Sequence, residues 1–128
     1  MDQKELVGAV AARTSLTREE AGDVTRAVLD GLARQLSEGE ARRLASDLPG
    51  PLARELQASP RRRPEAHPTG VDDFIRQVSE RTGLTGEDTR DGAGAVLAAL
   101  REALSGDGYR HLVGQLPDEY AALAETAS

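Results

Sequence analysis

The chain has 128 residues, a net charge of −6 and only three aromatic side chains, Phe74, Tyr109 and Tyr120. This length suits one domain with a sizeable core, and the scarcity of aromatic residues disfavours an all-β fold. The acidic charge argues against nucleic acid or an anionic membrane surface as a partner, because binding to either depends on clustered cations. The chain has no cysteine, which excludes disulfides and thiolate zinc sites.

The sequence carries no sign of export or membrane insertion. The first ten residues, MDQKELVGAV, lack the basic and apolar regions of a secretory signal peptide. No stretch approaches the roughly 18 uninterrupted apolar residues that a membrane-spanning helix needs. We therefore expect a cytoplasmic protein.

The chain contains an internal duplication. A shift of 68 residues aligns residues 6–56 with residues 74–124 without a gap, and 18 of those 51 positions are identical. This predicts two tandem homologous units, residues 1–58 and residues 71–128, each with about four helices. Because one unit alone has a thin core, we expect both to pack as a single all-α bundle with approximate twofold symmetry.

The first helix of the first unit is predicted over about residues 3–13, where Leu6, Val7 and Val10 fall at helical spacing. A long central helix follows within residues 16–36, and its counterpart lies within residues 84–104. Each carries an apolar stripe wide enough to face more than one neighbour. We therefore expect these two long helices to be the centres of their units.

Capping signals predict where the helices start. In the first unit, Thr17 with Glu20 and Ser37 with Glu40 form capping boxes at the second and third helices. The counterpart of the second box, residues 105–109 (SGDGY), predicts a looser turn because of its glycines. Leu-Pro pairs end the third helices at Pro49 and Pro117. Short fourth helices are predicted at two places, residues 51–57 and 118–126.

Residues 59–70, SPRRRPEAHPTG, predict an extended, solvated linker between the units because they hold three prolines and three consecutive arginines. Thr69 with Asp72 is predicted to cap the next helix. The consecutive cations Arg61, Arg62 and Arg63 are the candidate site residues, for binding an anionic partner. The alternative is that the three arginines have no binding role. They would then be solvated or lie against the acidic second unit, which carries 11 negative and 5 positive side chains.

Other patterns have structural explanations. The run from Gly92 to Ala95 lies inside a predicted helix, unlike a phosphate loop, and indicates close helix packing. His67 and His111 have no partner at metal-ligand spacing. The three aromatic residues align with apolar positions of the first unit, so we expect them in the core. Repeated polar residues such as Arg13 and its counterpart Arg81 are expected to form caps and salt bridges within their own unit.

Four short motifs, in the same order and spacing in both units, resemble a known bacterial family. They are the F/L-x3-V pattern at residues 6–10 and 74–78, the Leu-Thr starts at 16–17 and 84–85, the Ala-Val-Leu-x2-Leu core at 27–32 and 95–100, and the Leu-Pro stops. Nearly the whole chain is similar to the domain-of-unknown-function family 2267 (DUF2267), common in actinobacteria. The resemblance implies an all-helical fold and assigns no catalytic residue.

We expect a non-enzymatic interaction, regulatory or scaffold protein, because the sequence holds no nucleophile–base pair, metal spacing or phosphate loop. Its partner is expected to be another protein or a second copy, which makes a homodimer one form, through a helical groove or the acidic second unit. The alternative is a small-ligand-binding protein with a pocket between the units. No catalytic residue, metal, cofactor, nucleic acid or membrane partner is expected.

Overall fold

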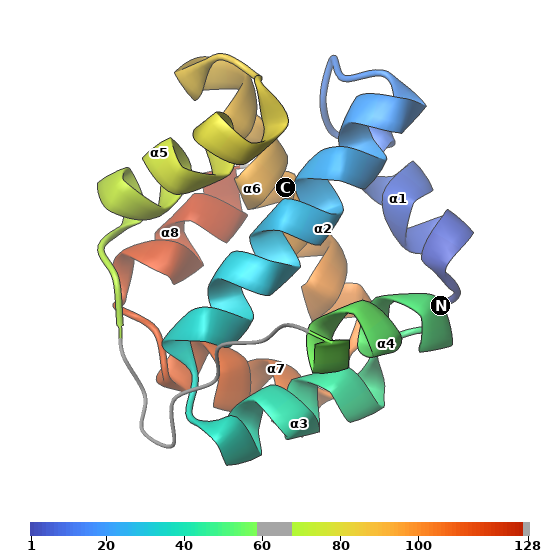
Figure 1. Ribbon diagram of the computed structural model, residues 1–128, viewed down its shortest axis with the longest axis vertical. Coiled ribbons are helices and arrows are strands. Elements are labelled where there is room, and N and C mark those ends of the chain that lie inside the picture. The colour runs from blue at the N-terminus through green and yellow to red at the C-terminus, as the bar shows by residue number, and fades with distance from the viewer. Residues whose placement is uncertain (59–67, 127–128) are drawn as a thin grey trace.

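A computed structural model describes residues 1–58 and 68–126, and this part of the chain is all-helical (Figure 1). The helices are α1 (Gln3–Ala12), α2 (Arg18–Gln35), α3 (Glu38–Asp47), α4 (Gly50–Ala58), α5 (Val71–Thr82), α6 (Gly86–Ala103), α7 (Gly106–Gly114) and α8 (Glu119–Thr126). The prediction of an all-helical fold is therefore confirmed for the described residues. Arg61, Arg62 and Arg63 lie outside the described residues.

The helix bounds of the second half follow those of the first at a nearly constant offset. Both α2 and α6 have 18 residues, and they begin at residues 18 and 86. Helices α1 and α5 begin at residues 3 and 71, and α3 and α7 at residues 38 and 106. Equivalent stretches of sequence therefore form equivalent helices.

The capping box predicted at the start of α2 is confirmed. Thr17 Oγ1 accepts a hydrogen bond from the Glu20 N–H at 3.1 Å, and Glu20 Oε1 accepts one from the Thr17 N–H at 2.9 Å. These bonds satisfy donors that the helix itself cannot pair. In α6, Thr85 Oγ1 accepts from the Asp88 N–H at 3.1 Å.

The looser turn predicted before α7 is wrong. Ser105 Oγ accepts a hydrogen bond from the Gly108 N–H at 3.0 Å, and Ser37 Oγ accepts one from the Glu40 N–H at 3.3 Å. The two serines also have the same backbone geometry, with φ of −60° and −63°. The serine hydroxyl oxygen needs only a backbone N–H three residues later, and glycine supplies that N–H as well as glutamate does.

The cap predicted for α5 from Thr69 and Asp72 is also wrong. The N-cap residue is Gly70, which offers no side-chain hydrogen bond. Instead, Glu119 Oε1 at the start of α8 accepts a hydrogen bond from the Val71 N–H. A residue 48 positions away therefore supplies the acceptor that local sequence was expected to supply.

Helix α6 lies at the centre of the molecule. Residues 92–100 are buried without interruption, because α1, α2, α5 and α8 pack around them. The sequence of this stretch, GAGAVLAAL, is apolar on every face, as a helix surrounded by others requires. A Cβ added to Gly92 would lie 3.0 Å from Val24 Cγ2. The close packing predicted for residues 92–95 is therefore confirmed.

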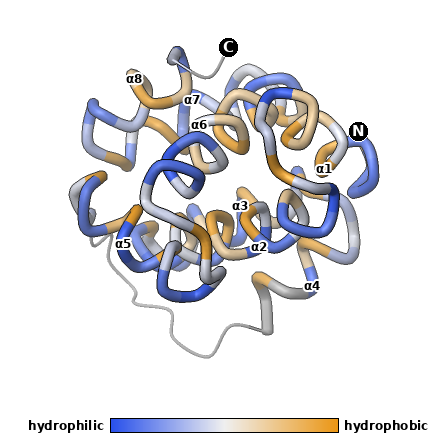
Figure 2. The backbone as a smooth tube through the Cα atoms, turned by 90° about the horizontal axis from the view of Figure 1, so that it is seen from above, coloured by the Kyte–Doolittle hydropathy of each residue, from blue (hydrophilic) through white to orange (hydrophobic). Residues whose placement is uncertain are grey.

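One apolar core joins residues from all eight described helices. The tube of Figure 2 changes between blue and orange along most helices, as each helix turns from solvent towards this core. Phe74 and Tyr120 are fully buried in it, with ring centroids 5.4 Å apart in an edge-to-face arrangement. Tyr109 is half-buried against it. The core placement predicted for Phe74 and Tyr120 is confirmed.

The first helix of each half packs on the central helix of the other half. Helix α1 contacts α6 as well as α2, and α5 contacts α2 as well as α6. Gly31 of α2 makes the second crossing possible, because a Cβ there would lie 2.7 Å from Cε1 of Phe74. The Phe74 ring of α5 therefore rests directly on the backbone of α2.

Two ion pairs repeat this crossed pattern. Arg13, after α1, contacts Glu102 of α6 at 2.9 Å, and Arg81 of α5 contacts Asp30 of α2. The expectation that Arg13 and Arg81 form salt bridges within their own half is wrong, although Arg13 Nη1 also donates a hydrogen bond to the Ala9 carbonyl of α1 at 3.2 Å. The ends of α1 and α5 lie against the other half's central helix, so the nearest carboxylates belong to that half. Such partly exposed pairs contribute roughly 0–1 kcal/mol each.

The fourth helices differ in their packing. Helix α4 packs mainly on α3, whereas α8 packs mainly along α6. In Figure 1, α3, α4 and α7 gather at the end of the molecule opposite the connections between α1 and α2 and between α5 and α6. The surfaces of the two halves are consequently unlike each other, although their helix bounds correspond.

We predict that Gly31→Ala destabilises the protein by about 1–3 kcal/mol in urea unfolding, because the new Cβ overlaps the Phe74 ring. Alanine by itself favours the helix by about 1 kcal/mol. In a Phe74→Leu background the same change should cost nothing, because the overlapping ring atoms are gone. Gly39→Ala is the control, since nothing lies within 4 Å of its added Cβ. An equal cost of Gly31→Ala in both backgrounds would contradict the crossed packing.

Candidate functional site

A groove of about 440 Å³ lies between α1 and the first half of α2. We call it the α1–α2 groove, and its lining residues are Gln3, Lys4, Val7, Arg18, Glu19, Gly22 and Arg26. Val7 is 8% exposed and Gly22 is buried, so the floor is apolar backbone and side chain. The charged residues form its rim.

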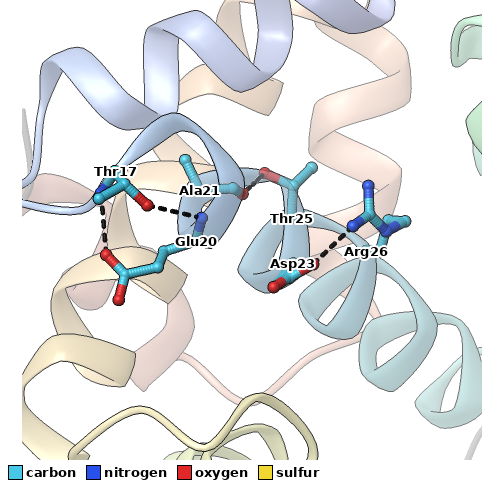
Figure 3. Close-up of polar contacts among 6 residues, drawn as sticks. All are labelled: Thr17, Glu20, Ala21, Asp23, Thr25 and Arg26. Carbon is cyan, nitrogen blue, oxygen red and sulfur yellow. Dashed lines mark hydrogen bonds and ion pairs between the residues drawn. The ribbon is translucent and has the colours of Figure 1, made fainter.

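Two arginines of this groove lie over glycines of α1 and α2. Arg18 Nη2 lies 3.2 Å from the Cβ position of Gly8, and Arg26 Nη1 lies 3.4 Å from that of Gly22. Figure 3 shows Arg26 with its partner Asp23, one turn after the Thr17–Glu20 capping box. Because these glycines have no side chains, the guanidinium groups can lie close to the helix backbone. The two guanidinium groups therefore lie near the floor of the groove and close to the helix backbone.

The three cations of the groove differ in whether they have an ion-pair partner. Arg26 Nη2 contacts Asp23 Oδ1 at 2.7 Å. Within residues 1–58 and 68–126, the side chains of Lys4 and Arg18 make no hydrogen bond or ion pair. Arg18 is the first residue of α2, where a positive charge is unfavourable for the helix dipole. Its presence there is not explained by helix stability.

The second half lacks these cations. A shift of 68 residues places Asp72, Gly86 and Gly94 at the positions of Lys4, Arg18 and Arg26. The cationic lining formed by Lys4, Arg18 and Arg26 is therefore a property of the first half alone. The sequence could have indicated the groove, because these three cations are absent from the corresponding positions of the second half. Only the packing of α1 against α2 shows that they line one groove.

A second, smaller cavity of about 230 Å³ lies where α2, α4 and the end of α5 meet. We call it the α2–α4 cavity, and it is lined by Arg26, Leu29, Asp30, Leu52, Leu56 and Arg81. It lies at the boundary of the two halves, because Arg81 belongs to the second. The space lined by residues of α3 and α7 is far smaller, about 10 Å³.

A buried polar network joins α2, α8 and the chain entering α5. Gln35 Nε2 donates to the Tyr120 hydroxyl at 2.9 Å, that hydroxyl donates to the Thr69 carbonyl at 2.6 Å, and the Thr69 N–H donates to Gln35 Oε1 at 2.7 Å. Burial raises the pKa of Tyr120 to about 12, against a lowering by the Gln35 hydrogen bond. Since the three residues satisfy each other, the network is structural.

The remaining candidate residues are not assembled into a reactive site. His111 Nδ1 lies 3.8 Å from Glu40 Oε1 across α3 and α7. Among the described residues, no group of three or more His, Cys, Asp and Glu side chains is placed to hold a metal ion. The described part of the chain also contains no helix of the length and apolarity needed to cross a membrane. His67 lies outside the described residues.

The fold and the groove together define an all-helical protein with a basic-lined surface groove on its first half. The family described as "Uncharacterized conserved protein (DUF2267)" matches residues 3–123, which is nearly the whole chain. The chain therefore belongs to this family, as its motifs indicated. No curated protein matches the chain.

The Tyr120 network generates a prediction about pH. Because the folded-state pKa is about 12 against an ordinary 10.0, the neutral hydroxyl stabilises the fold fully below pH 10, and this contribution disappears as the pH rises towards 12. We expect the free energy of unfolding, measured with urea, to fall by roughly 2 kcal/mol over that interval. Tyr120→Phe should remove most of this pH dependence.

At neutral pH, Tyr120→Phe should itself cost about 1–3 kcal/mol, because it leaves Gln35 Nε2 and the Thr69 carbonyl without their partner. Tyr109→Phe is the control. Burial raises the pKa of Tyr109 as well, but its side chain is only half-buried and is no part of the network. Most of the alkaline loss should therefore persist in Tyr109→Phe. If Tyr120→Phe still lost stability between pH 10 and pH 12, the assignment of this loss to ionisation of Tyr120 would be wrong.

Proposed function

We propose that this protein is a non-enzymatic interaction module that binds an acidic segment of another protein in the α1–α2 groove. One observation carries the proposal. Lys4, Arg18 and Arg26 surround an apolar floor in a chain whose net charge is −6. Two of these cations have no partner within the described residues. A carboxylate-bearing partner supplies what they lack.

An amphipathic helix is the partner segment that suits this shape. Its apolar face would rest on Val7 and on the backbone at Gly22, and its carboxylates would reach the arginine and lysine heads. Hydrogen bonds between guanidinium and carboxylate are among the stronger polar contacts in proteins. Glu19, the carboxylate on the rim, repels an acidic residue placed opposite it. It therefore helps to set the register of the bound segment.

The architecture is part of the same proposal. We propose that residues 1–58 and 71–128 are duplicated units joined by residues 59–70 and related by an approximate twofold axis. The constant offset of the helix bounds supports this arrangement, as do the crossed contacts of α1 with α6 and α5 with α2. The two copies have since diverged, and the binding surface belongs to the first. A cytoplasmic location stays a prediction.

Charge reversal in the groove tests the function. We expect Lys4→Glu/Arg18→Glu to lose the protein partner that immobilised wild-type protein retains from a native lysate, because a like charge now faces the acidic segment. Retention by wild type should weaken as salt increases. The matched control is Arg76→Glu/Arg110→Glu, which changes the net charge equally at exposed sites on α5 and α7.

The retained partner is then identified, and its acidic segment is prepared as a peptide. Fluorescence anisotropy should show binding to wild type and to the Arg76→Glu/Arg110→Glu control. It should show binding weakened at least about tenfold for the groove variant and for a peptide with Glu and Asp replaced by Gln. The proposal would be wrong if wild type, the groove variant and the control retained the partner equally. It would also be wrong if the neutralised peptide bound wild type as tightly as the acidic peptide.

A further inference from the structure

The first two turns of α6 carry two carboxylates without a partner. Glu87 and Asp91 are exposed and lie four residues apart, so their side chains share one face of the helix. Within residues 1–58 and 68–126, neither side chain makes a hydrogen bond or an ion pair. Arg90, the cation between them in the sequence, is already paired with Asp72 at 3.0 Å. We call Glu87 and Asp91 the α6 acidic pair.

Equivalent positions of the two halves carry different charges. In the first half, the α1–α2 groove and the first two turns of α2 hold three cations and three carboxylates, which are Lys4, Arg18, Arg26, Glu19, Glu20 and Asp23. The same positions shifted by 68 residues hold one cation and four carboxylates, which are Arg90, Asp72, Glu87, Asp88 and Asp91. Asp23 pairs with Arg26 at 2.7 Å. The corresponding residues are Asp91 and Gly94, so the second half lacks this pair.

The spacing of the groove cations matches that of the α6 acidic pair. Arg18 Nη2 lies 3.2 Å from the Cβ position of Gly8, and Lys4 precedes Gly8 by four residues in α1. The Arg18 guanidinium and the Lys4 backbone are therefore separated by one helical turn along α1, or roughly 6 Å. Glu87 and Asp91 are also one turn apart. A helix that carries this pair can therefore place one carboxylate at each cation.

One copy does not bring these groups together. Helices α2 and α6 begin at the same end of the molecule (Figure 1). There the Cβ position of Gly92 lies 3.4 Å from Cδ1 of Leu16, just before α2. Because residues 92–100 are buried in the core, the start of α6 is held in this position. The α6 acidic pair consequently faces solvent without contacting Lys4 or Arg18 of its own chain. A second copy approaching from solution has no such constraint.

From these observations we infer that the α1–α2 groove also receives a second copy of this chain. The first two turns of α6 of one copy lie along α1 of the other, with Glu87 and Asp91 against Lys4 and Arg18. Self-association therefore covers the groove, and an acidic segment of another protein has to compete with it. The inference rests on the proposed function in one respect, which is that the groove binds carboxylates. It adds self-association as the control on access to that groove.

The response of self-association to salt follows from its origin in ion pairs. A contact held by a few exposed pairs is weak, so we expect a dissociation constant of about 0.1–1 mM. Each copy has a net charge of −6, but at 0.1 M salt the screening length of about 10 Å already suppresses repulsion between distant charges. Raising the salt concentration from about 0.1 M to 0.5 M should therefore weaken self-association. Association that strengthened with salt would overturn the inference.

The decisive test uses the purified full chain and a pair of complementary charge reversals. Sedimentation equilibrium up to about 1 mM should show a mass that increases with wild-type concentration. The groove variant, Lys4→Glu/Arg18→Glu, and the α6 variant, Glu87→Lys/Asp91→Lys, should each self-associate at least about tenfold more weakly. An equimolar mixture of the two variants should associate as wild type does, because each reversed groove then faces a reversed α6.

Asp73→Lys/Asp107→Lys is the matched control for the α6 variant. It changes the net charge equally, at carboxylates that are 65% and 71% exposed in the first turns of α5 and α7. It should self-associate at least as tightly as wild type. Circular dichroism checks that every variant is folded. If Glu87→Lys/Asp91→Lys is not, Glu87→Gln/Asp91→Asn takes its place and should also weaken self-association.

Each of three results would overturn the inference. They are a wild type that stays monomeric at about 1 mM, an α6 variant that associates as wild type does, and a mixture of the two variants that stays monomeric. The α6 variant keeps the groove cations, so it should still retain the lysate partner. A monomeric wild type that retains this partner rejects the inference alone, whereas self-association without any retained partner rejects the proposed function alone.

Discussion

The packing of each half's first helix on the other half's central helix is the constraint on which the rest of the structure depends. Helix α1 lies on α6 and α5 lies on α2, so each central helix is covered by helices from both halves. At Gly31 the crossing is close enough that the Phe74 ring touches helix backbone. The arginines at the ends of α1 and α5 follow from the same geometry, because the carboxylates within their reach belong to the opposite half. A single core joining all the described helices is the result.

Against this shared core, the differences between the halves are concentrated at the surface and in the fourth helices. Helix α8 lies along α6 and supplies Tyr120 to the core and Glu119 to the start of α5. Helix α4 packs on α3 instead, and its leucines wall the α2–α4 cavity. The cations of the α1–α2 groove are likewise found only in the first half. The proposed duplication accounts for the corresponding helix bounds, and the proposed binding groove lies where the two halves differ in sequence.

The order and bounds of the helices could be read from the sequence because caps and apolar spacing are local, as at Thr17 and Glu20. Contacts between residues far apart in the chain could not be read from the sequence. The acceptor for the Val71 N–H comes from Glu119, and Arg13 reaches Glu102, although local patterns pointed elsewhere. The groove was missed for a related reason. Lys4, Arg18 and Arg26 are scattered in the sequence and become one surface only when α1 packs against α2. The proposed candidates Arg61, Arg62 and Arg63 lie outside the described residues, so their role stays a prediction.

The most direct measurement of the central claim separates the two halves. Fragments spanning residues 1–58 and 68–128 are prepared individually, and thermal and urea unfolding are followed by circular dichroism. The account predicts that neither fragment alone shows a cooperative transition, since each loses helices of the other half that pack on its central helix. It also predicts that an equimolar mixture recovers helical content and cooperative unfolding. Cooperative folding of residues 1–58 alone, with the stability of the full chain, would contradict it.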